Sequence, residues 1–350
     1  VDNIDDINVS NGTLISQIEF TTINTGGTTT YEWTNDNTDI GLVDSGNESI
    51  PEFTAINDGD IPITGTIEVT PILEENGVIC SGDSETFTIT VNPDAQVNEI
   101  DDLVYNDGDL VQIPFTSSNT GGDNSYEWTS TNSETGLEDS GSGDIEFTAT
   151  NTASNSPIVT TVTVIPTFTN GDDTNSGEPE TFTITVNPIA QIEPMEDITL
   201  CEGEELEAII FSTLNTGGTT TYEWTNDNTD IGLAANGVGD IPSFTVTNDT
   251  TSVLIATIEV TPTYENGGVS NTGNSETFTI TVNPGAQVET VTSQVLCVGE
   301  STDEIVFDTT NTDGTTTYEW TNDNTDIGLA SNGVGDIPSF TVTNDTTSAL

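Results

Sequence analysis

A repeated tripeptide constrains what this chain can fold into more than any other feature. Tyr-Glu-Trp occurs four times in the 350 residues and contains every tryptophan of the chain. These tryptophans are Trp33, Trp128, Trp224 and Trp320. Successive copies lie 95, 96 and 96 residues apart. A fixed period of this length indicates a tandem array, in which one structural unit is used repeatedly.

A second motif has the same period and marks the ends of the units. Thr-Phe-Thr-Ile-Thr-Val-Asn-Pro ends at Pro93, Pro188 and Pro284. The two motifs together predict four modules: module 1 (residues 1–97), module 2 (98–192), module 3 (193–288) and module 4 (289–350). Leu350 aligns with Leu254, in the middle of module 3. We therefore expect module 4 to be incomplete and the sequence to be a segment of a longer protein.

Each module is predicted to be a series of short strands. In module 3, apolar residues alternate with threonine and glutamate, the pattern of a strand that is buried on one face. The predicted strands of module 3 span residues 207–211, 220–224, 242–246, 256–262 and 277–282. No stretch keeps the apolar period of a helix. Six or seven short strands in about 95 residues predict an all-β fold of immunoglobulin-like β-sandwiches. The four tryptophans are predicted to be core residues, those of modules 1–3 facing Phe87, Phe182 and Phe278.

The linkers between modules are short and alike. Asn-Pro-x-Ala-Gln occupies residues 92–96, 187–191 and 283–287. Proline fixes its own φ angle, and so few residues leave little freedom. We therefore expect a semi-rigid linear array of modules.

The charge of the chain excludes several functions. There are 60 Asp and Glu residues and no Lys, Arg or His, for a net charge of −60. A Schiff-base lysine, a histidine general base and a Ser-His-Asp triad are therefore absent. Nucleic acid and anionic membranes are excluded as partners, because binding them relies on cationic side chains. We expect the charge to be screened in a saline or calcium-rich extracellular medium, or by a basic partner protein.

Several motifs resemble those of a known group of bacterial surface proteins. In module 3, Tyr-x-Trp-Thr-Asn-x-Asn is followed by Ile-Gly-Leu, Gly-Asp-Ile-Pro-Ser-Phe-Thr and Thr-Phe-Thr-Ile-Thr-Val-Asn-Pro. This series is similar to the PKD-like repeats of giant surface adhesins of Bacteroidota. These include the gliding-motility adhesins that the type IX secretion system exports. The resemblance covers nearly the whole chain, although module 2 departs from it at residues 129–133.

The resemblance implies secreted, cell-surface modules of PKD-like type and a disulfide inside each module. In such adhesins a cysteine near the module start commonly pairs with one in a Gly-Val-x-Cys segment. Cys201 and Cys297 stand at the first position and Cys80 at the second. No module has both, because Ser10 replaces the first in module 1 and Asn271 the second in module 3. A disulfide within the module and small buried thiols both remain open. The lysine that often precedes Thr-Phe-Thr is replaced by Glu85, Glu180 and Glu276.

Two polar patterns are candidate sites. Asn-Asp-Asn-Thr-Asp follows the tryptophan in three modules, and closely spaced carboxylate and amide oxygens suit Ca²⁺. The candidate ligands are Asp36, Asp39, Asp227, Asp230, Asp323 and Asp326. We favour the alternative, a solvated loop with turn hydrogen bonds and no cofactor. Asp-Thr-Thr resembles the O-glycosylation signal of Bacteroidota. It marks Thr250, Thr309 and Thr346 as candidate glycosylation sites.

Catalytic patterns are present but not specific. Asp-Ser-Gly at residues 44–46 and 139–141 matches the short signature of aspartic proteases, in which two carboxylates share a proton. Modules 3 and 4 have Ala-Asn-Gly and Ser-Asn-Gly in that position, which indicates a turn. Paired carboxylates could also serve a glycosidase, but none of the 60 acids stands out. Tyrosine and tryptophan could stack on sugars, although one aromatic pair in each sandwich is more typical of a core.

The sameness of the modules favours a structural function. An enzyme would place unique residues in one module, whereas a stalk repeats itself. Our main hypothesis is a non-enzymatic stalk or spacer of a bacterial cell-surface adhesin or filament. Its partners would be other modules of the same long chain, lateral copies of the chain or a basic protein. The alternatives are a calcium-rigidified extender, a carbohydrate- or ligand-binding module of a giant adhesin and, third, an extracellular hydrolase.

Overall fold

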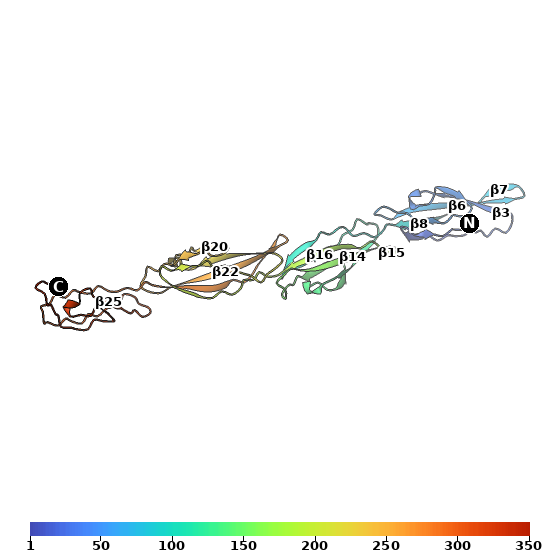
Figure 1. Cartoon of the computed structure of the whole chain (residues 1–350). Coiled ribbons are helices and arrows are strands. Elements are labelled where there is room, and N and C mark those ends of the chain that lie inside the picture. The colour runs from blue at the N-terminus through green and yellow to red at the C-terminus, as the bar shows by residue number, and fades with distance from the viewer. The chain divides into compact units, whose positions relative to one another are not determined.

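The structure is a computed structural model that describes residues 1–350. It is built from β-strands, with four single-turn 3-10 helices (η1–η4) as its helical segments (Figure 1). None of these helices is long and apolar enough to cross a bilayer. The predicted all-β architecture, with sheets repeated in tandem, is confirmed.

The chain divides into two compact units, which are described separately. The first unit contains Val1–Ile189 together with Asn266–Asn271. The second contains Ala190–Glu265 together with Thr272–Leu350. The strands of modules 1 and 2 therefore lie in the first unit.

The first unit contains two sets of strands that follow the same order along the chain. Module 1 has β1 (Ile7–Ser10), β2 (Leu14–Ile15), β3 (Thr28–Asn35), η1 (Thr38–Ile40), β4 (Ser45–Asn47), β5 (Phe53–Thr54), β6 (Ile63–Glu75), β7 (Val78–Ser81) and β8 (Glu85–Asn92). Module 2 has β9 (Leu103–Asn106), β10 (Leu110–Ile113), β11 (Asp123–Ser130), η2 (Ser133–Thr135), β12 (Ser140–Ser142), β13 (Ile145–Thr148), β14 (Ile158–Asn170), β15 (Asp173–Ser176) and β16 (Glu180–Asn187).

Modules 3 and 4 lie in the second unit, apart from residues 266–271, which belong to the first, and module 3 repeats the order of strands in full. Module 3 has β17 (Ile198–Cys201), β18 (Glu205–Leu206), β19 (Thr219–Asn226), η3 (Thr229–Ile231), β20 (Asn236–Val238), β21 (Phe244–Thr245), β22 (Leu254–Asn266), β23 (Val269–Thr272) and β24 (Glu276–Asn283). Module 4 has β25 (Glu319–Thr321), η4 (Thr325–Ile327) and β26 (Asn332–Val334).

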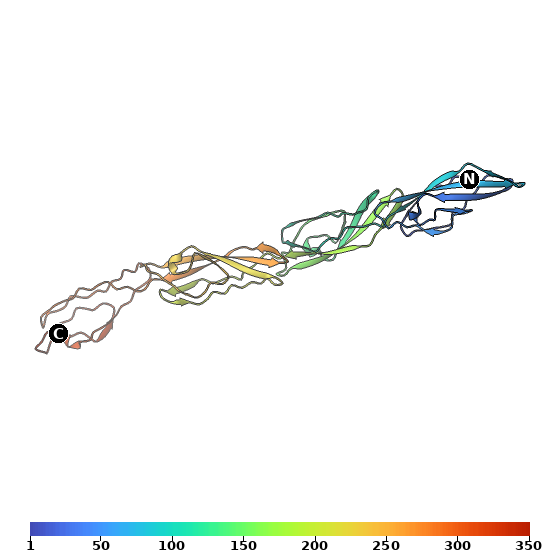
Figure 2. The same cartoon turned by 90° about the horizontal axis from the view of Figure 1, so that it is seen from above.

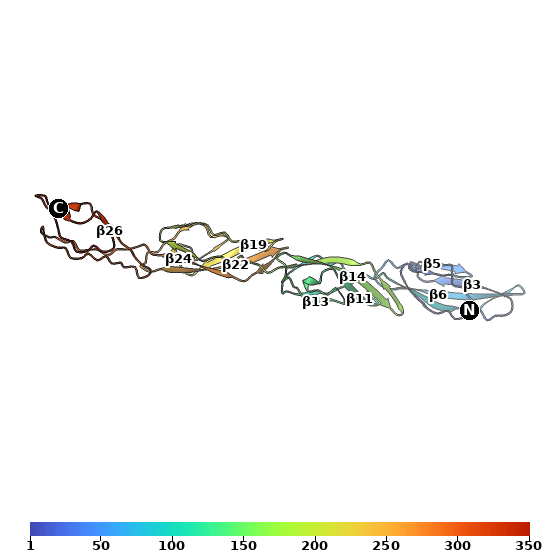
Figure 3. The same ribbon diagram turned by 60° about the horizontal axis from the view of Figure 1, so that its bottom comes forward.

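Modules 1, 2 and 3 share one sheet topology. In module 1 the large sheet has the order β1-β8-β6-β3-β4, with β7 also paired to β6, and a small sheet pairs β2 with β5. Strand β1 runs parallel to β8, whereas β6 is antiparallel to β3 and β8. The long strands of the large sheet run along the module (Figure 2), and β5 lies in a separate layer from β3 and β6 (Figure 3).

The alternation predicted from sequence places one face of the large sheet in the core. In β6, Ile67 and Val69 are fully buried, whereas Glu68 between them is exposed. These side chains join Trp33 and Phe87 in a single apolar cluster, which residues of the small sheet also line. Modules 2 and 3 have equivalent clusters. Each module is therefore a two-layered sandwich with its own core.

The long strand continues through a proline, which corrects the predicted end of one strand. β22 was expected to end at Pro262 but extends to Asn266. In module 1 the equivalent Pro71 lies between the part of β6 that pairs with β8 and the part that pairs with β7. The carbonyl oxygen of Pro71 accepts a hydrogen bond from Gly82 N (2.9 Å). Neither β7 nor β8 pairs with Pro71, so the backbone N–H that proline lacks is not needed there. The proline therefore marks the change of partner strand.

Two other predicted strands are shorter than expected. Residues 207–211 do not form a strand. β18 ends at Leu206, and only an isolated β-bridge joins Ile209 to Ile241. The backbone N–H of Phe211 donates to Asp240 Oδ1 (2.9 Å) instead of to a neighbouring strand. β21 likewise covers only Phe244–Thr245 of the predicted 242–246. At Phe211 a side-chain oxygen accepts the backbone hydrogen bond that a neighbouring strand would accept in a regular sheet.

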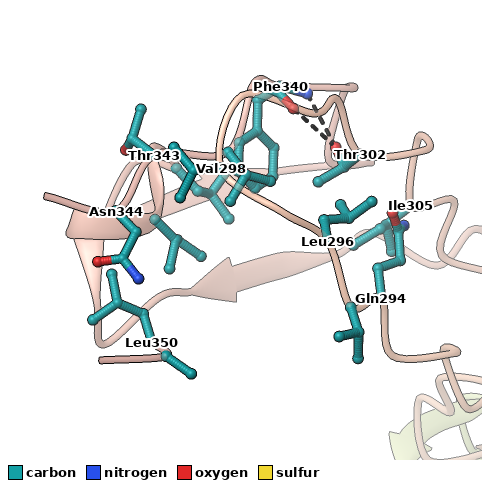
Figure 4. Close-up of a pocket in the computed structure, with 14 residues that line it drawn as sticks. Gln294, Leu296, Val298, Thr302, Ile305, Phe340, Thr343, Asn344 and Leu350 are labelled. Carbon is teal, nitrogen blue, oxygen red and sulfur yellow. Dashed lines mark hydrogen bonds between the residues drawn. The ribbon is translucent and has the colours of Figure 1, made fainter. Parts of the chain in front are cut away.

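The core of module 4 is open in this structure. The sequence ends at Leu350, the counterpart of the first residue of β22, and a cavity of about 410 Å³ opens between the apolar side chains of module 4 (Figure 4). Leu296, Ile305 and Phe340 line this cavity. Their counterparts in module 3, Leu200, Ile209 and Phe244, pack against the closed core. The cavity is therefore the uncovered side of a sandwich, with the composition of a core rather than of a ligand site.

Candidate functional site

The joint between modules 1 and 2 lies inside the first unit. We define the joint as the hairpin β14–β15 of module 2, the ends of β1 and β8 in module 1, and the linker of residues 93–96. Asn170 pairs with Asp173 across the turn of this hairpin. The equivalent hairpin of module 1, β6–β7, has the same register around a two-residue turn.

A buried asparagine is the centre of the joint. Asn92, 1% exposed, donates from Nδ2 to Asn8 Oδ1 (2.8 Å) and to Asp173 Oδ2 (2.8 Å). Its Oδ1 accepts from Asn170 Nδ2 (2.8 Å), and Ser10 Oγ donates to Asp173 Oδ2 at 2.7 Å. All polar atoms of the Asn92 side chain are thus bonded, as a buried amide requires. The Asn92 side chain on β8 therefore links β1 of its own module to β14 and β15 of the next module.

The linker backbone is held by the same hairpin. Asn175 Nδ2 donates to Pro93 O (3.0 Å), and Asn175 Oδ1 accepts from Ala95 N (2.9 Å). Ala95 is 4% exposed, and a Cβ atom at Gly177 would lie 1.8 Å from its carbonyl oxygen. The close approach therefore requires glycine at position 177. The linker is fixed by contacts as well as by its proline.

The same chemistry recurs one module later in the first unit. Asn187 is fully buried; it donates from Nδ2 to Asn266 O (3.1 Å) and accepts on Oδ1 from Asn266 Nδ2 (2.9 Å). Asn271 Nδ2 donates to Pro188 O (3.2 Å), as Asn175 does to Pro93. Asn106, at the position of Ser10, donates to Ser270 O at 2.8 Å. The joint thus repeats with the period of the sequence.

The candidate calcium loops make the turn hydrogen bonds of the alternative interpretation. Asn37 Oδ1 caps η1 by accepting from Asp39 N (3.1 Å), and Asp36 Oδ1 accepts from Thr66 N (2.6 Å). The equivalent Asp227 Oδ1 accepts from Thr257 N (2.7 Å). Asp39, Asp230 and Asp326 each follow the capping asparagine of their 3-10 helix, whereas Asp323 lies just before it. No group of three or more Asp, Glu, Cys or His side chains in residues 1–350 could hold a metal ion.

The candidate glycosylation sites use their hydroxyl groups inside turns. Thr250 Oγ1 donates to Asn248 Oδ1 (2.7 Å) and lies 2.9 Å from Ser252 O, and Thr346 makes the same pair of contacts. Thr309 Oγ1 donates to Asn311 Oδ1 (2.9 Å). Thr250 and Thr346 are exposed, and Thr309 is half-buried. A sugar on any of these oxygens would replace turn hydrogen bonds.

The tryptophans pack against a glycine on the neighbouring strand. Trp33, Trp128 and Trp224 are 2, 7 and 5% exposed, and Trp320 is half-buried. Phe87, Phe182 and Phe278 belong to the same three clusters as the first three tryptophans. A Cβ atom at Gly46 would lie 2.3 Å from the ring of Trp33. Gly46 is the glycine of the Asp-Ser-Gly sequence at residues 44–46. In module 1 this glycine allows the ring of Trp33 to lie against the backbone of β4.

The cysteines lie at positions that rule out the disulfide implied by the resemblance. Cys80 is opposite Leu73 on β6, whereas Ser10 is opposite Asn92, beside Ile63 at the other end of β6. The ten residues from Ile63 to Leu73 span about 33 Å at ~3.3 Å per residue. A disulfide needs Cα atoms roughly 4–7 Å apart. Pairing inside one module is therefore excluded, and Cys80, Cys201 and Cys297 are free and exposed.

In each complete module, the aspartate just before the first strand bonds to the backbone of the last strand. Asp6, Asp102 and Asp197 each accept a 2.7 Å hydrogen bond from a backbone N–H, of Thr88, Thr183 and Thr279 respectively. This backbone bond, and then the threonine hydroxyl, lower the pKa of Asp197 below 3.8. The hydroxyl and then the backbone bond do the same for the pKa of Asp102.

The lowered pKa of Asp197 predicts a pH-dependent effect of Asp197→Ala. A carboxylate with a lowered pKa in the folded state stabilises the protein above about pH 4, and this contribution is lost as the pH falls through the folded-state pKa. We expect the variant to lower the melting temperature of the module at pH 7, and the difference from the wild type to shrink as the pH falls below about 4. Glu196→Ala, an exposed neighbouring acid, is the control. An Asp197 effect that is independent of pH would contradict the assignment.

Comparisons with known proteins show a likeness of fold. No protein-family model and no curated protein matches the chain. The human desmocollin-1 ectodomain matches with 13% identity and a TM-score of 0.32, over 99% of this chain and 74% of that one. Mouse cadherin-23 EC22–24 matches with 11% identity and a TM-score of 0.38, over 81 and 96%. Three N-terminal domains of the bacteriophage RB49 outer capsid protein Hoc match with 12% identity and a TM-score of 0.37, over 76 and 91%.

Proposed function

We propose that this chain is a non-enzymatic spacer of an extracellular, cell-surface adhesin or filament. The observation that carries the proposal is the joint, where Asn92 and its counterpart Asn187 are buried by hydrogen bonds between successive modules. A rotation that kept Asn92 buried would leave its amide without hydrogen-bond partners, which costs about 1–3 kcal/mol. Modules joined in this way resist rotation about the linker.

The repetition of the joint supports a spacer over an enzyme. Asparagines at the module ends bond to the neighbouring module, whereas the carboxylates of Asp36 and Asp227 accept hydrogen bonds from backbone N–H groups of their own modules. The motif resemblance to PKD-like repeats of Bacteroidota adhesins supports the finer proposal of a surface adhesin of gliding-motility type, exported by type IX secretion.

The length of the strands sets the expected reach. A strand of 13 residues, such as β6, β14 or β22, spans about 43 Å at ~3.3 Å per residue. Four modules joined end to end would therefore span on the order of 150 Å. Its proposed partners are other modules of the same chain, lateral copies of it or a basic protein.

Small-angle X-ray scattering of the chain tests the spacer. We expect a maximum dimension on the order of 150 Å. The double variant Asn170→Ala/Asn175→Ala removes joint contacts but no core side chain, and is expected to broaden the distance distribution and reduce its mean. Asn47→Ala, an exposed asparagine on β4, is the matched control and should change neither. A wild-type chain with the dimension of one or two modules would overturn the proposal, and an unchanged double variant would show that the joint does not set the reach.

A further inference from the structure

The tip of the hairpin β6–β7 in module 1 is exposed, whereas the equivalent hairpins of modules 2 and 3 contact the preceding module. The residues Val78, Ile79 and Cys80 stand where module 2 has Asp173, Thr174 and Asn175. Val78 and Ile79 are 63 and 68% exposed, and Cys80 is exposed. An apolar hairpin tip is thus held out in solvent at the place where the other hairpins make their joint contacts.

The joint inside the first unit shows what such a hairpin contacts. Asp173 bonds to Asn92 and to Ser10, and Asn175 bonds to the linker at Pro93 and Ala95. The receiving surface is therefore the C-terminal end of a preceding module. We call it the socket: the last residue of the module's first strand, the asparagine before the linker proline, and the linker itself.

The cysteines occupy matching positions on these two surfaces. Cys80 stands at the hairpin position of Asn175 and Asn271, whereas Cys201 and Cys297 stand at the socket position of Ser10 and Asn106. At the joints, Ser10 contacts Asp173, two residues before Asn175, and Asn106 contacts Ser270, the residue before Asn271. The socket position of one module therefore faces the hairpin strand of the next. Inside one module the two positions lie about 33 Å apart along the long strand.

We propose that the hairpin β6–β7 docks on the socket of another module of this repeat, and that Cys80 forms a disulfide there with a cysteine at the position of Cys201. The occupant is a complete module with the Asn-Pro linker and a socket cysteine. The bond forms by exchange with a small-molecule disulfide such as oxidised glutathione. Two protein thiols lose two electrons and two protons and form one S–S bond, and the glutathione disulfide is reduced to two thiols. The inference goes beyond the spacer function, because it concerns how modules are cross-linked.

The first test makes the two possible pairings compete within the full chain. The double variant Ser10→Cys/Asn175→Cys places thiols at the socket and hairpin positions of the module 1–2 joint, while Cys80 remains in module 1. The protein is incubated with oxidised glutathione and cut with a glutamate-specific protease, since it has no Lys or Arg for trypsin. Linked peptides are identified by mass spectrometry. We expect most molecules to link position 10 to position 175 and to leave Cys80 unlinked by any protein disulfide.

The controls make this test decisive. Ser10→Cys alone has no second thiol at the module 1–2 joint, and position 10 is expected not to link to Cys80 of its own module. A link between positions 10 and 80 in either variant would overturn the proposal. The proposal would also be overturned if the double variant melted at the same temperature as the wild type and still formed no disulfide between positions 10 and 175.

The second test supplies a socket cysteine in front of module 1. A copy of residues 193–287, which carries Cys201 and ends with the linker, is joined in front of Val1 of the full chain. We expect a disulfide between the cysteine of the copy and Cys80, and Cys80→Ser in the same protein should abolish it. Cys80 that stays reduced would overturn the proposal. A disulfide between the Cys80 residues of two chains, formed as readily without the added module, would also overturn it and assign the hairpin to self-association.

Discussion

Trp224→Ala is expected to destabilise module 3 by about 3–5 kcal/mol, the usual cost of removing a large aromatic side chain from a core. Trp224 is 5% exposed and shares its cluster with Ile258, Val260 and Phe278. Its ring also lies on Gly237, where a Cβ atom would come within 2.2 Å of it. Gly237 has no side chain that could move into the space that the ring leaves, so the cavity should persist.

Denaturant unfolding measures this loss. The array is not a two-state system, so the unfolding of module 3 must be followed separately from that of the other modules. Hydrogen exchange of the β22 amides then reports on module 3 in both proteins. Trp320→Ala is the matched control, because Trp320 is half-buried in an open core and should cost clearly less. Equal losses at the two positions would contradict the assignment of Trp224 to a closed core.

Sodium chloride is expected to raise the melting temperature of this protein. The chain carries 60 carboxylates and no Lys, Arg or His, so surface charges repel and no side-chain ion pair offsets them. Each exposed pair repels weakly, but the repulsion sums over a module. Salt at about 1 M shortens the screening length from ~10 Å at 0.1 M to ~3 Å and should remove most of it. Proteins with surfaces rich in salt bridges respond in the opposite direction.

Calcium separates screening from specific binding. Because the carboxylates of Asp36 and Asp227 already accept backbone hydrogen bonds, we expect Ca²⁺ to act as NaCl does at equal ionic strength. A much larger rise with Ca²⁺ would establish specific sites, and Asp227→Asn and Asp230→Asn would then locate them. A melting temperature that neither salt moves would overturn the electrostatic argument altogether. It would then point to counterions held by dense lateral packing or to a basic partner.

The period of the sequence was enough to predict the modules and their class of fold. Strands of the type seen in β6 and β24 bury every second side chain, and the alternation of Phe278, Ile280 and Val282 with threonine is visible without a structure. The prediction was wrong where a side chain or a change of partner replaces the ladder, as at Phe211 and Pro262. Those features depend on residues more than ten positions away.

The sequence by itself determined that this chain is a tandem all-β array with a strongly negative charge, because period, alternation and composition are local properties. Only the tertiary structure decided which groups the joint asparagines bond to and where in a module the cysteine positions lie. Asn92 meets Asn170 and Asp173 across 78 and 81 residues of chain, and no local pattern records such a pair. The same holds for the cysteine positions. Positions 10 and 80 belong to the same module, but a strand of 13 residues separates them and places them at opposite ends of it.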